Sequence, residues 1–216
     1  INLAELRLYY YPPGSNSVTV YPIGIGQLDS NTLTPTMVTT VSDKRANPTW
    51  TPTANIRARY KAKGIDLPAV VPAGPDNPMG HHAIRLAAYG GVYLLHGTNA
   101  DFGIGMRVSS GCIRLRDADI LALFNAVKPG TKVNIINTPI KASVEPDGRR
   151  LVEVHQPLSK RLEDDPKTLP IVLNAAMSSF KADASTDAVT MEHAMDVRSG
   201  MPVDVSAHVP APANAI

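Results

Sequence analysis

The order of apolar and polar residues predicts a chain made mainly of short strands. The segment from Leu3 to Tyr11 alternates, with Leu6, Leu8 and Tyr10 on one side, as a half-buried strand does. Further short apolar runs lie between Gly, Pro and Asn residues, at 17–25, 37–41, 83–88, 92–96 and 132–137. This density of strands predicts a mainly β fold with a β-sandwich or barrel-like core.

Residues 117–127 carry the clearest helical pattern in this part of the chain. Their apolar members recur at helical spacing, at Ile120, Leu123, Phe124 and Val127. We expect Asp117 to cap the start of this helix, because a short acidic side chain accepts hydrogen bonds from the first free N–H groups. Pro129 and Gly130 should end it.

A proline-rich segment separates the predicted strands between Asn47 and Gly80. It holds one predicted helix, at 54–63. Long segments outside a main sheet often act as lids over a site. An excursion that merely packs on the surface is the equally weighted alternative.

The chain changes character after residue 137. A hairpin closed by Pro146, Asp147 and Gly148 is predicted first, because these residue types favour a tight turn. Two helices should follow, at 168–181 and 186–198, and the low-complexity residues 207–216 suggest a flexible end. We therefore divide the chain into a mainly β domain at 1–138, a hairpin and helical extension at 139–200, and a flexible tail at 201–216.

Composition narrows the classes of function. The 216 residues are 44% hydrophobic, with 21 basic and 19 acidic residues interspersed, so no basic patch marks a nucleic-acid partner. We expect no membrane insertion, because no run approaches the roughly 18 apolar residues that a spanning helix needs. The chain begins with Ile1 instead of Met, which we interpret as a fragment of a longer precursor.

The single cysteine, Cys112, is the first candidate for chemistry. It permits neither an internal disulfide nor a metal site built on several thiolates. A lone cysteine is often a small buried hydrophobic residue, so its neighbours must decide. His96 ends an apolar run sixteen residues earlier, and Gly111 directly precedes the cysteine.

These residue types suit nucleophilic catalysis. An imidazole near neutrality takes the proton of a thiol and holds the thiolate as an ion pair. Gly111 permits a tight turn, so that the N–H groups of Gly111 and Cys112 face a developing oxyanion. The pairing of Cys112 with His96 is weak evidence by itself, because a histidine at a strand end is more often a core residue.

A longer motif carries a resemblance. The segment HGTNADFGIGMRVSSGCIRLRD, together with YPIGIG, PTWTP, ANIRARY and NPMGHHAIRL, resembles the L,D-transpeptidase family with its YkuD-type catalytic domain. The similarity covers about residues 1–140. The usual family signature is His-Gly-Thr, a Gly-rich loop, Ser-His-Gly-Cys and often Ile-Arg-Leu.

The resemblance implies a role for each matching residue. Cys112 matches the nucleophile, His96 the general base, and Gly97 the residue whose carbonyl orients the imidazole. Ser109 and Gly111 match the supports of the thiol loop.

Two further positions of the signature are less settled. Arg114 matches a basic residue that we assign to a substrate carboxylate, although a structural role is the alternative. Ser110 departs from the signature, where the family carries a second histidine. That departure favours His96 as the proton acceptor.

The other histidines are weaker candidates. His81 and His82 precede a predicted strand and are secondary candidates to line the cleft, whereas the histidines of the extension, His155, His193 and His208, should face solvent. A zinc site built from His81, His82, His96 and Cys112 is disfavoured, because a metal-bound Cys112 loses its nucleophilic role.

The family's activity follows as an expectation. A donor tetrapeptide of peptidoglycan acylates the cysteine, D-Ala leaves, and a second stem peptide takes the acyl group in a 3-3 cross-link between meso-diaminopimelate residues. No metal and no organic cofactor are expected, the compartment is the periplasm, and carbapenems should acylate the thiol. A periplasmic thiol reductase is an expected partner, because no second cysteine protects the thiol. The alternatives are attachment of a lipoprotein, hydrolysis, and a catalytically silent peptidoglycan-binding domain.

Overall fold

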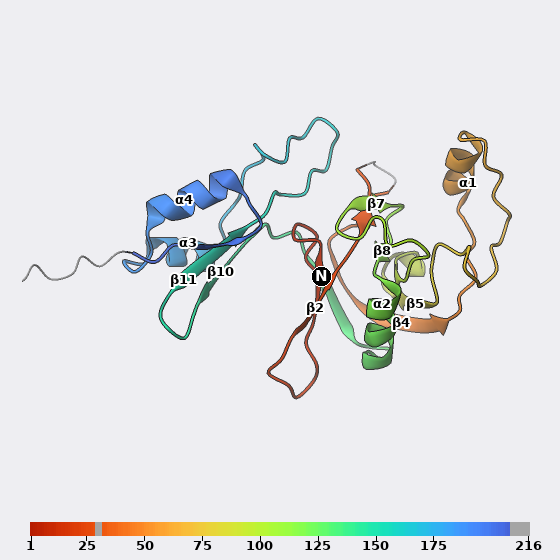
Figure 1. Cartoon of the computed structure of the whole chain (residues 1–216), viewed down its shortest axis with the longest axis horizontal. Helices are drawn as coiled ribbons and strands as arrows, with labels where there is room; N and C mark the ends of the chain where they lie inside the picture. Colours follow the sequence, from red (N-terminus) through yellow and green to blue (C-terminus); the bar gives the residue numbers. More distant parts are fainter. Residues whose placement is uncertain (29–31, 208–216) are drawn as a thin grey trace, which may run out of the picture. The chain divides into compact units, whose positions relative to one another are not determined.

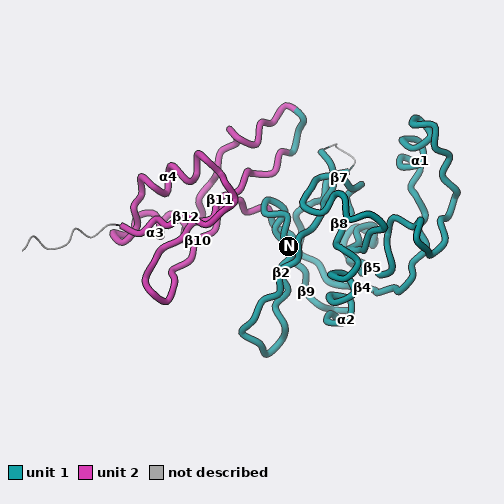
Figure 2. Tube along the Cα trace, in the orientation of Figure 1, with its two compact units in different colours: residues 1–136, 160–162 teal, residues 137–159, 163–216 magenta. Residues whose placement is uncertain are grey.

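The computed structural model describes residues 1–28 and 32–207, and these fold as two units (Figure 2). Unit 1 comprises Ile1–Ile136 with Lys160–Leu162, and unit 2 comprises Asn137–Ser159 with Glu163–Ile216. Among the described residues, the helices are all too short or too polar to cross a membrane.

A five-stranded sheet is the centre of unit 1 (Figure 1). In spatial order its strands are β8 (Ile113–Arg114), β6 (Leu94–His96), β5 (His82–Leu86), β4 (Met37–Ala46) and β9 (Lys132–Ile135). The β6–β8 pair is parallel and the other pairs are antiparallel. The predicted mainly β class is confirmed.

Two smaller sheets complete the strands of unit 1. They are the antiparallel pair β1 (Arg7–Tyr10) with β2 (Thr19–Pro22) and the parallel pair β3 (Ile25–Gly26) with β7 (Arg107–Ser109). The predicted strand from Leu3 is shorter than expected, because residues 3–6 form a turn in which Leu6 has a left-handed φ of 53°, and the strand begins only at Arg7.

One face of the main sheet forms the core. Ile84, Leu95 and Ile113 pair across β5, β6 and β8, and each is almost completely buried. Helix α2 (Asp117–Ala126) covers this face and contributes Ile120 and Leu123 to the same core. The opposite face of the sheet is left for the site.

Asp117 does not cap α2 as the sequence suggests. The N-cap is Arg116, whose side chain makes no capping bond, and Asp117 is the first helical residue. The Asp117 carboxylate instead accepts the backbone N–H of His81 and contacts the His81 ring. The negative charge of Asp117 in the first turn still interacts favourably with the positive end of the helix dipole.

The proline-rich segment leaves the sheet and returns to it, and it carries α1 (Ala54–Lys61) (Figure 1). The Thr53 hydroxyl caps α1 by accepting the N–H of Ile56 at 3.3 Å. The buried amide of Asn77 donates to the carbonyls of Pro48 and Pro72 at 2.8 and 3.1 Å, which ties both ends of the segment together.

Unit 2 is a three-stranded sheet with two helices. Its strands are β10 (Ile140–Val144), β11 (Arg150–Val154) and β12 (Pro202–Asp204), all antiparallel, and its helices are α3 (Ala175–Ala182) and α4 (Ala188–Val197). The helices pack on the hairpin around a core that includes Val152, Met177 and Met191.

Two expectations for unit 2 differ from the structure. Helix α3 begins at Ala175 because Asn174 caps it, later than the predicted residue 168. Part of the predicted tail from residue 201 is the strand β12, because Val203 pairs with Val152 and the neighbouring Val205 is fully buried. Residues 208–216, including His208, lie outside the described part of the chain.

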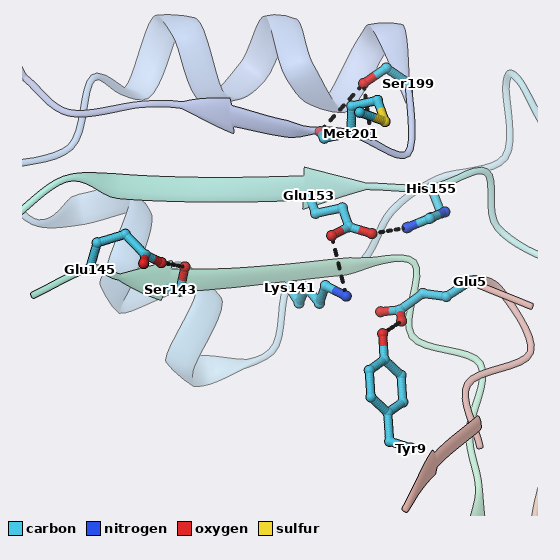
Figure 3. A network of polar contacts seen from close by, with 9 residues as sticks. All are labelled: Glu5, Tyr9, Lys141, Ser143, Glu145, Glu153, His155, Ser199 and Met201. Carbon is cyan, nitrogen blue, oxygen red and sulfur yellow. Dashed lines mark hydrogen bonds and ion pairs between the residues drawn. The ribbon is translucent and has the colours of Figure 1, made fainter. Parts of the chain in front are cut away.

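A half-buried network lies on the hairpin of unit 2 (Figure 3). The Glu153 carboxylate contacts the Lys141 ammonium at 3.3 Å and the His155 Nε2 at 2.6 Å. Only 14% of the His155 side chain is exposed, so it does not face solvent as the sequence suggests. His193 on α4 is exposed, as expected.

Candidate active site

The free face of the five-stranded sheet carries two rows of side chains that line a cleft of about 830 Å³. Paired residues on neighbouring strands point to the same face, and every second residue along a strand does so too. One row consists of Asp43, Arg85, Leu94 and Cys112, and the other of Arg45, Ala83, His96 and Arg114. Cys112 joins its row because the next residue, Ile113, pairs with Leu95.

These rows make His96 and Cys112 diagonal neighbours. His96 pairs with Arg114 across β6 and β8, and Cys112 lies two residues before Arg114. Diagonal residues on adjacent strands are within reach of long or aromatic side chains. The sheet register therefore places His96 and Cys112 on the same face of adjacent strands, although sixteen residues separate them in the sequence.

Hydrogen bonds to two hydroxyl groups, those of Ser109 and Thr34, hold the loop that carries the thiol. The Ser109 hydroxyl donates to the Cys112 carbonyl at 2.5 Å and accepts the Gly111 N–H at 3.1 Å. The buried Thr34 hydroxyl donates to the Gly111 carbonyl at 2.9 Å and accepts the Gly26 N–H at 2.9 Å. Gly111 itself has a left-handed φ of 108°, which favours glycine at this turn.

This arrangement corrects one expectation for the oxyanion site. The Gly111 N–H is already bonded to the Ser109 hydroxyl, so it does not face the cleft as a free donor. The Ser109 hydroxyl likewise donates its hydrogen bond to the Cys112 carbonyl and is not free to donate to a ligand. Ser109 and Gly111 thus hold the loop, and other donors must meet a developing oxyanion.

The His96 ring is held in one tautomer. Its Nδ1 lies 2.6 Å from the Gly97 carbonyl, which can only accept, so Nδ1 carries the proton and Nε2 keeps its lone pair. The side chain is 6% exposed, and this burial lowers the pKa of His96 to about 4. The Gly97 carbonyl acts in the opposite direction, and the nearby Arg114 charge lowers the pKa further. His96 is therefore neutral at physiological pH.

The thiol is neutral at rest as well. Burial raises the pKa of Cys112, while a backbone hydrogen bond from Leu94 and the charges of Arg114 and Arg85 act against this rise. The Cys112 thiol lies 3.8 Å from the Val92 carbonyl, to which it donates a weak hydrogen bond. The lowered pKa of His96 and the raised pKa of Cys112 both favour a neutral imidazole and a neutral thiol over the ion pair expected from the sequence.

Arg114 lies beside the pair with unused hydrogen-bonding capacity. Burial lowers the pKa of its guanidinium, yet the group stays charged because its ordinary pKa is far above neutrality. The buried Nε of Arg114 has no hydrogen-bond partner within the described chain. An unsatisfied buried donor is costly, which favours a site for an anionic ligand group.

The proline-rich segment supplies the outer wall of the cleft. Trp50 and Tyr60 line it, and the Arg59 guanidinium of α1 donates to the Ser110 hydroxyl at 2.5 Å. Ser110, the position that departs from the family signature, thus connects the thiol loop to this segment. The contact favours the lid interpretation of residues 47–80 over a mere surface excursion.

Sequence reasoning overlooked three residues at the site. Thr34 supports the thiol loop, Arg59 contacts it, and Arg85 lies in the same row as Cys112. Only Arg85 left a usable signal, because it alternates with the buried Ile84 and Leu86 and so must point to the opposite face.

The two adjacent histidines lie away from the cleft. His81 contacts the Asp117 carboxylate at the start of α2, and the His82 ring packs against Phe124 at 4.9 Å between centroids. Neither lines the cleft as the sequence suggests. In the described part of the chain, no three His, Cys, Asp or Glu side chains gather closely enough to bind a metal ion.

Comparison with known families assigns both units. Residues 1–135 match the model of the L,D-transpeptidase catalytic domain, and residues 139–205 match that of the L,D-transpeptidase C-terminal domain. The first match corresponds to the unit that holds the cleft.

Individual relatives carry matching names. The chain is 82% identical over 212 residues, 98% of its length, to the probable L,D-transpeptidase YcfS of Escherichia coli K12, and 51% identical over 209 residues, 95% of its length, to the probable L,D-transpeptidase ErfK/SrfK of the same strain. It spans 66% of the length of each. A crystal structure of Mycobacterium tuberculosis L,D-transpeptidase 1 is a more distant likeness, with 18% identity, 63% of this chain and 59% of that chain covered, and a TM-score of 0.40.

Proposed function

The chain belongs to the L,D-transpeptidase family, and from this premise we propose that it forms 3-3 cross-links in peptidoglycan with Cys112 as nucleophile. The observation that carries the proposal is the sheet register that makes His96 a diagonal neighbour of Cys112, with a free lone pair on Nε2. No other pair of side chains in the described cleft combines a thiol with a neutral base.

The first half of the reaction forms a thioester. His96 Nε2 takes the thiol proton as the sulfur attacks the carbonyl of the L-centre of diaminopimelate in a donor tetrapeptide. The C–N bond to D-Ala breaks, and the leaving amine takes that proton from the His96 imidazolium. The Gly97 carbonyl holds the ring through Nδ1 in both steps. This oriented carbonyl replaces the carboxylate of a Ser-His-Asp triad.

The neutral state of both His96 and Cys112 determines when the proton is transferred relative to the attack of the sulfur. Because the pKa of His96 is low and that of Cys112 is raised, the proton moves during attack instead of before it. The side-chain amine of a second diaminopimelate then attacks the thioester, and His96 accepts the proton of that amine. The C–S bond breaks, and the His96 imidazolium returns the proton to the Cys112 sulfur as it leaves. No metal or organic cofactor takes part in this scheme.

Arg114 is the proposed partner of the terminal carboxylate of the donor. Its free Nε and its position beside His96 suit a carboxylate one residue beyond the reacting carbonyl. A pentapeptide ends in a second D-Ala and should overrun this contact. Tetrapeptide stems are thus the proposed donors.

The setting of the reaction follows from the same family. We place the chain in the periplasm, acting on peptidoglycan stem peptides. A half-buried thiol without a second cysteine in the chain is open to oxidation to sulfenic acid. An external thiol reductase is therefore a proposed partner, and carbapenems are proposed inhibitors.

The decisive experiment incubates the protein with disaccharide tetrapeptide and determines the products by mass spectrometry. We expect D-Ala and a diaminopimelate-to-diaminopimelate dimer, both absent with Cys112→Ala and reduced by orders of magnitude with His96→Gln. A tripeptide alone would indicate hydrolysis, and coupling only to a lipoprotein lysine would indicate an attachment enzyme. An unchanged substrate would indicate a silent binding domain, and any of these three results would overturn 3-3 cross-linking.

A further inference from the structure

A left-handed turn forms one wall of the cleft beside the thiol. In the short helix η1 (Ala88–Gly91), Tyr89, Gly90 and Gly91 all have positive φ, at 52°, 69° and 78°. Tyr89 is strained in this region, because a side chain with a Cβ adopts it at a cost. A contact from outside the 88–91 turn must therefore stabilise this backbone conformation.

Arg85 of β5 makes that contact. Its Nη1 donates to the Gly91 carbonyl at 2.7 Å, and its stem lies directly over Gly91. A Cβ at Gly91 would lie 3.0 Å from the Arg85 Cδ, so the close approach depends on glycine. The guanidinium thus clamps the end of the turn.

The chain that leaves this turn contacts the sulfur directly. Val92, the residue after the turn, offers its carbonyl to the Cys112 thiol at 3.8 Å. Two residues later, the Leu94 backbone provides the hydrogen bond that favours the thiolate. The turn consequently positions the Val92 carbonyl, whereas Leu94 is held by its pairing with Arg85 in the sheet.

Arg85 also lies in the same row as the thiol. It pairs with Leu94, and Cys112 is the next side chain in that row. Strands are about 4.8 Å apart, so the two Cα atoms are roughly 10 Å apart, a gap that an arginine stem largely spans. A positive charge at this range favours the thiolate over the thiol.

Several charged or titratable groups surround Cys112. His96 on β6 is neutral, Arg114 on β8 and Arg85 on β5 are cationic, Tyr93 follows the turn, and Arg59 of α1 reaches Ser110. A bound substrate carboxylate would neutralise Arg114. Arg85 donates to a backbone carbonyl and also faces the Asp43 carboxylate, its pair on β4, whose pKa its charge helps to lower.

We propose that Arg85 is a positioning residue for the nucleophile, one that clamps the 88–91 turn against the sulfur and stabilises the Cys112 thiolate by its charge. The inference rests on the proposed role of Cys112 as nucleophile. It adds a residue to the site to which the sequence analysis gave no role.

The test measures alkylation of Cys112 by iodoacetamide as a function of pH, which needs no peptidoglycan substrate. Arg85→Gln retains a donor for the Gly91 carbonyl but removes the charge, and Arg85→Lys retains the charge. We expect Arg85→Gln to move the midpoint of the pH profile upward and to slow alkylation at neutral pH roughly fivefold, because less thiolate is present. Arg85→Lys should stay near the wild-type profile.

Lys132→Gln is the matched control, because it removes one exposed positive charge from the same sheet outside the cleft. A profile for Arg85→Gln equal to wild type, or an equal shift with Lys132→Gln, would overturn the inference. Fluorescence of Trp50, the one tryptophan, checks that each variant folds. Absence of cross-linked products with an intact Arg85-dependent profile would instead count against the proposed function alone.

Discussion

The buried His96 predicts a specific loss of stability in acid. Its pKa falls from 6.5 to about 4 in the folded chain, mainly because burial disfavours the charged ring. Above pH 6.5 neither the folded nor the unfolded state holds the extra proton. Between pH 6.5 and 4, His96 is protonated in the unfolded state but remains neutral in the folded state. The free energy of unfolding therefore falls as the pH is lowered.

The size of this loss follows from the same two pKa values. A separation from 6.5 to about 4 corresponds to about 3 kcal/mol of folding free energy at pH 4, at 1.36 kcal/mol per unit. No discount for solvent screening applies, because His96 is only 6% exposed. For a small domain this is a large fraction of the total stability.

The assay is urea denaturation of wild type and His96→Gln at pH 7, 6, 5 and 4. Trp50 is the one tryptophan and lies in unit 1, so its fluorescence follows the unit that contains His96. Carboxylates titrate equally in both proteins, and the difference between them isolates the histidine. Wild type should lose about 3 kcal/mol more than the variant between pH 7 and 4. Parallel losses in the two proteins would refute the burial argument.

Three further predictions concern the loop, the substrate and the thiol. Thr34→Val removes both hydrogen bonds of a buried hydroxyl, so urea denaturation should register a loss of about 1–3 kcal/mol that the exposed control Thr36→Val does not share. Arg114→Ala should lower kcat/KM for tetrapeptide donors by about 1.5–3 kcal/mol of transition-state stabilisation, and unchanged kinetics would remove Arg114 from the site. A carbapenem should leave a covalent adduct that mass spectrometry maps to Cys112, and an adduct that persists in Cys112→Ala would place the nucleophile elsewhere.

Local sequence patterns were sufficient for the elements. Alternation and turn residues predicted the strands around Leu8, Ile84 and Leu95, because a half-buried strand repeats every two residues. The exact first and last residues of the strands and helices were predicted less well from the sequence. The left-handed φ of Leu6 delays the start of its strand to Arg7, and Ala175 starts its helix where Asn174 caps it. Such ends depend on local hydrogen bonds that compete with propensity.

The candidate site shows the same division. The sequence motif is sufficient to select Cys112, His96 and Arg114, and all three line one cleft. The same motif misjudges His81 and His82, because their neighbours Asp117 and Phe124 come from a helix more than thirty residues away.

By itself the sequence determined the mainly β class, the family and the residue types capable of chemistry, because periodicity and motifs are local properties. The tertiary structure alone decided which side chains share a face, since the β5–β6–β8 register joins Arg85 and Cys112 from distant segments. It also decided the charge state of His96 and Cys112, because burial depends on everything packed around a group. A register shifted by one residue would turn the same side chains into the core.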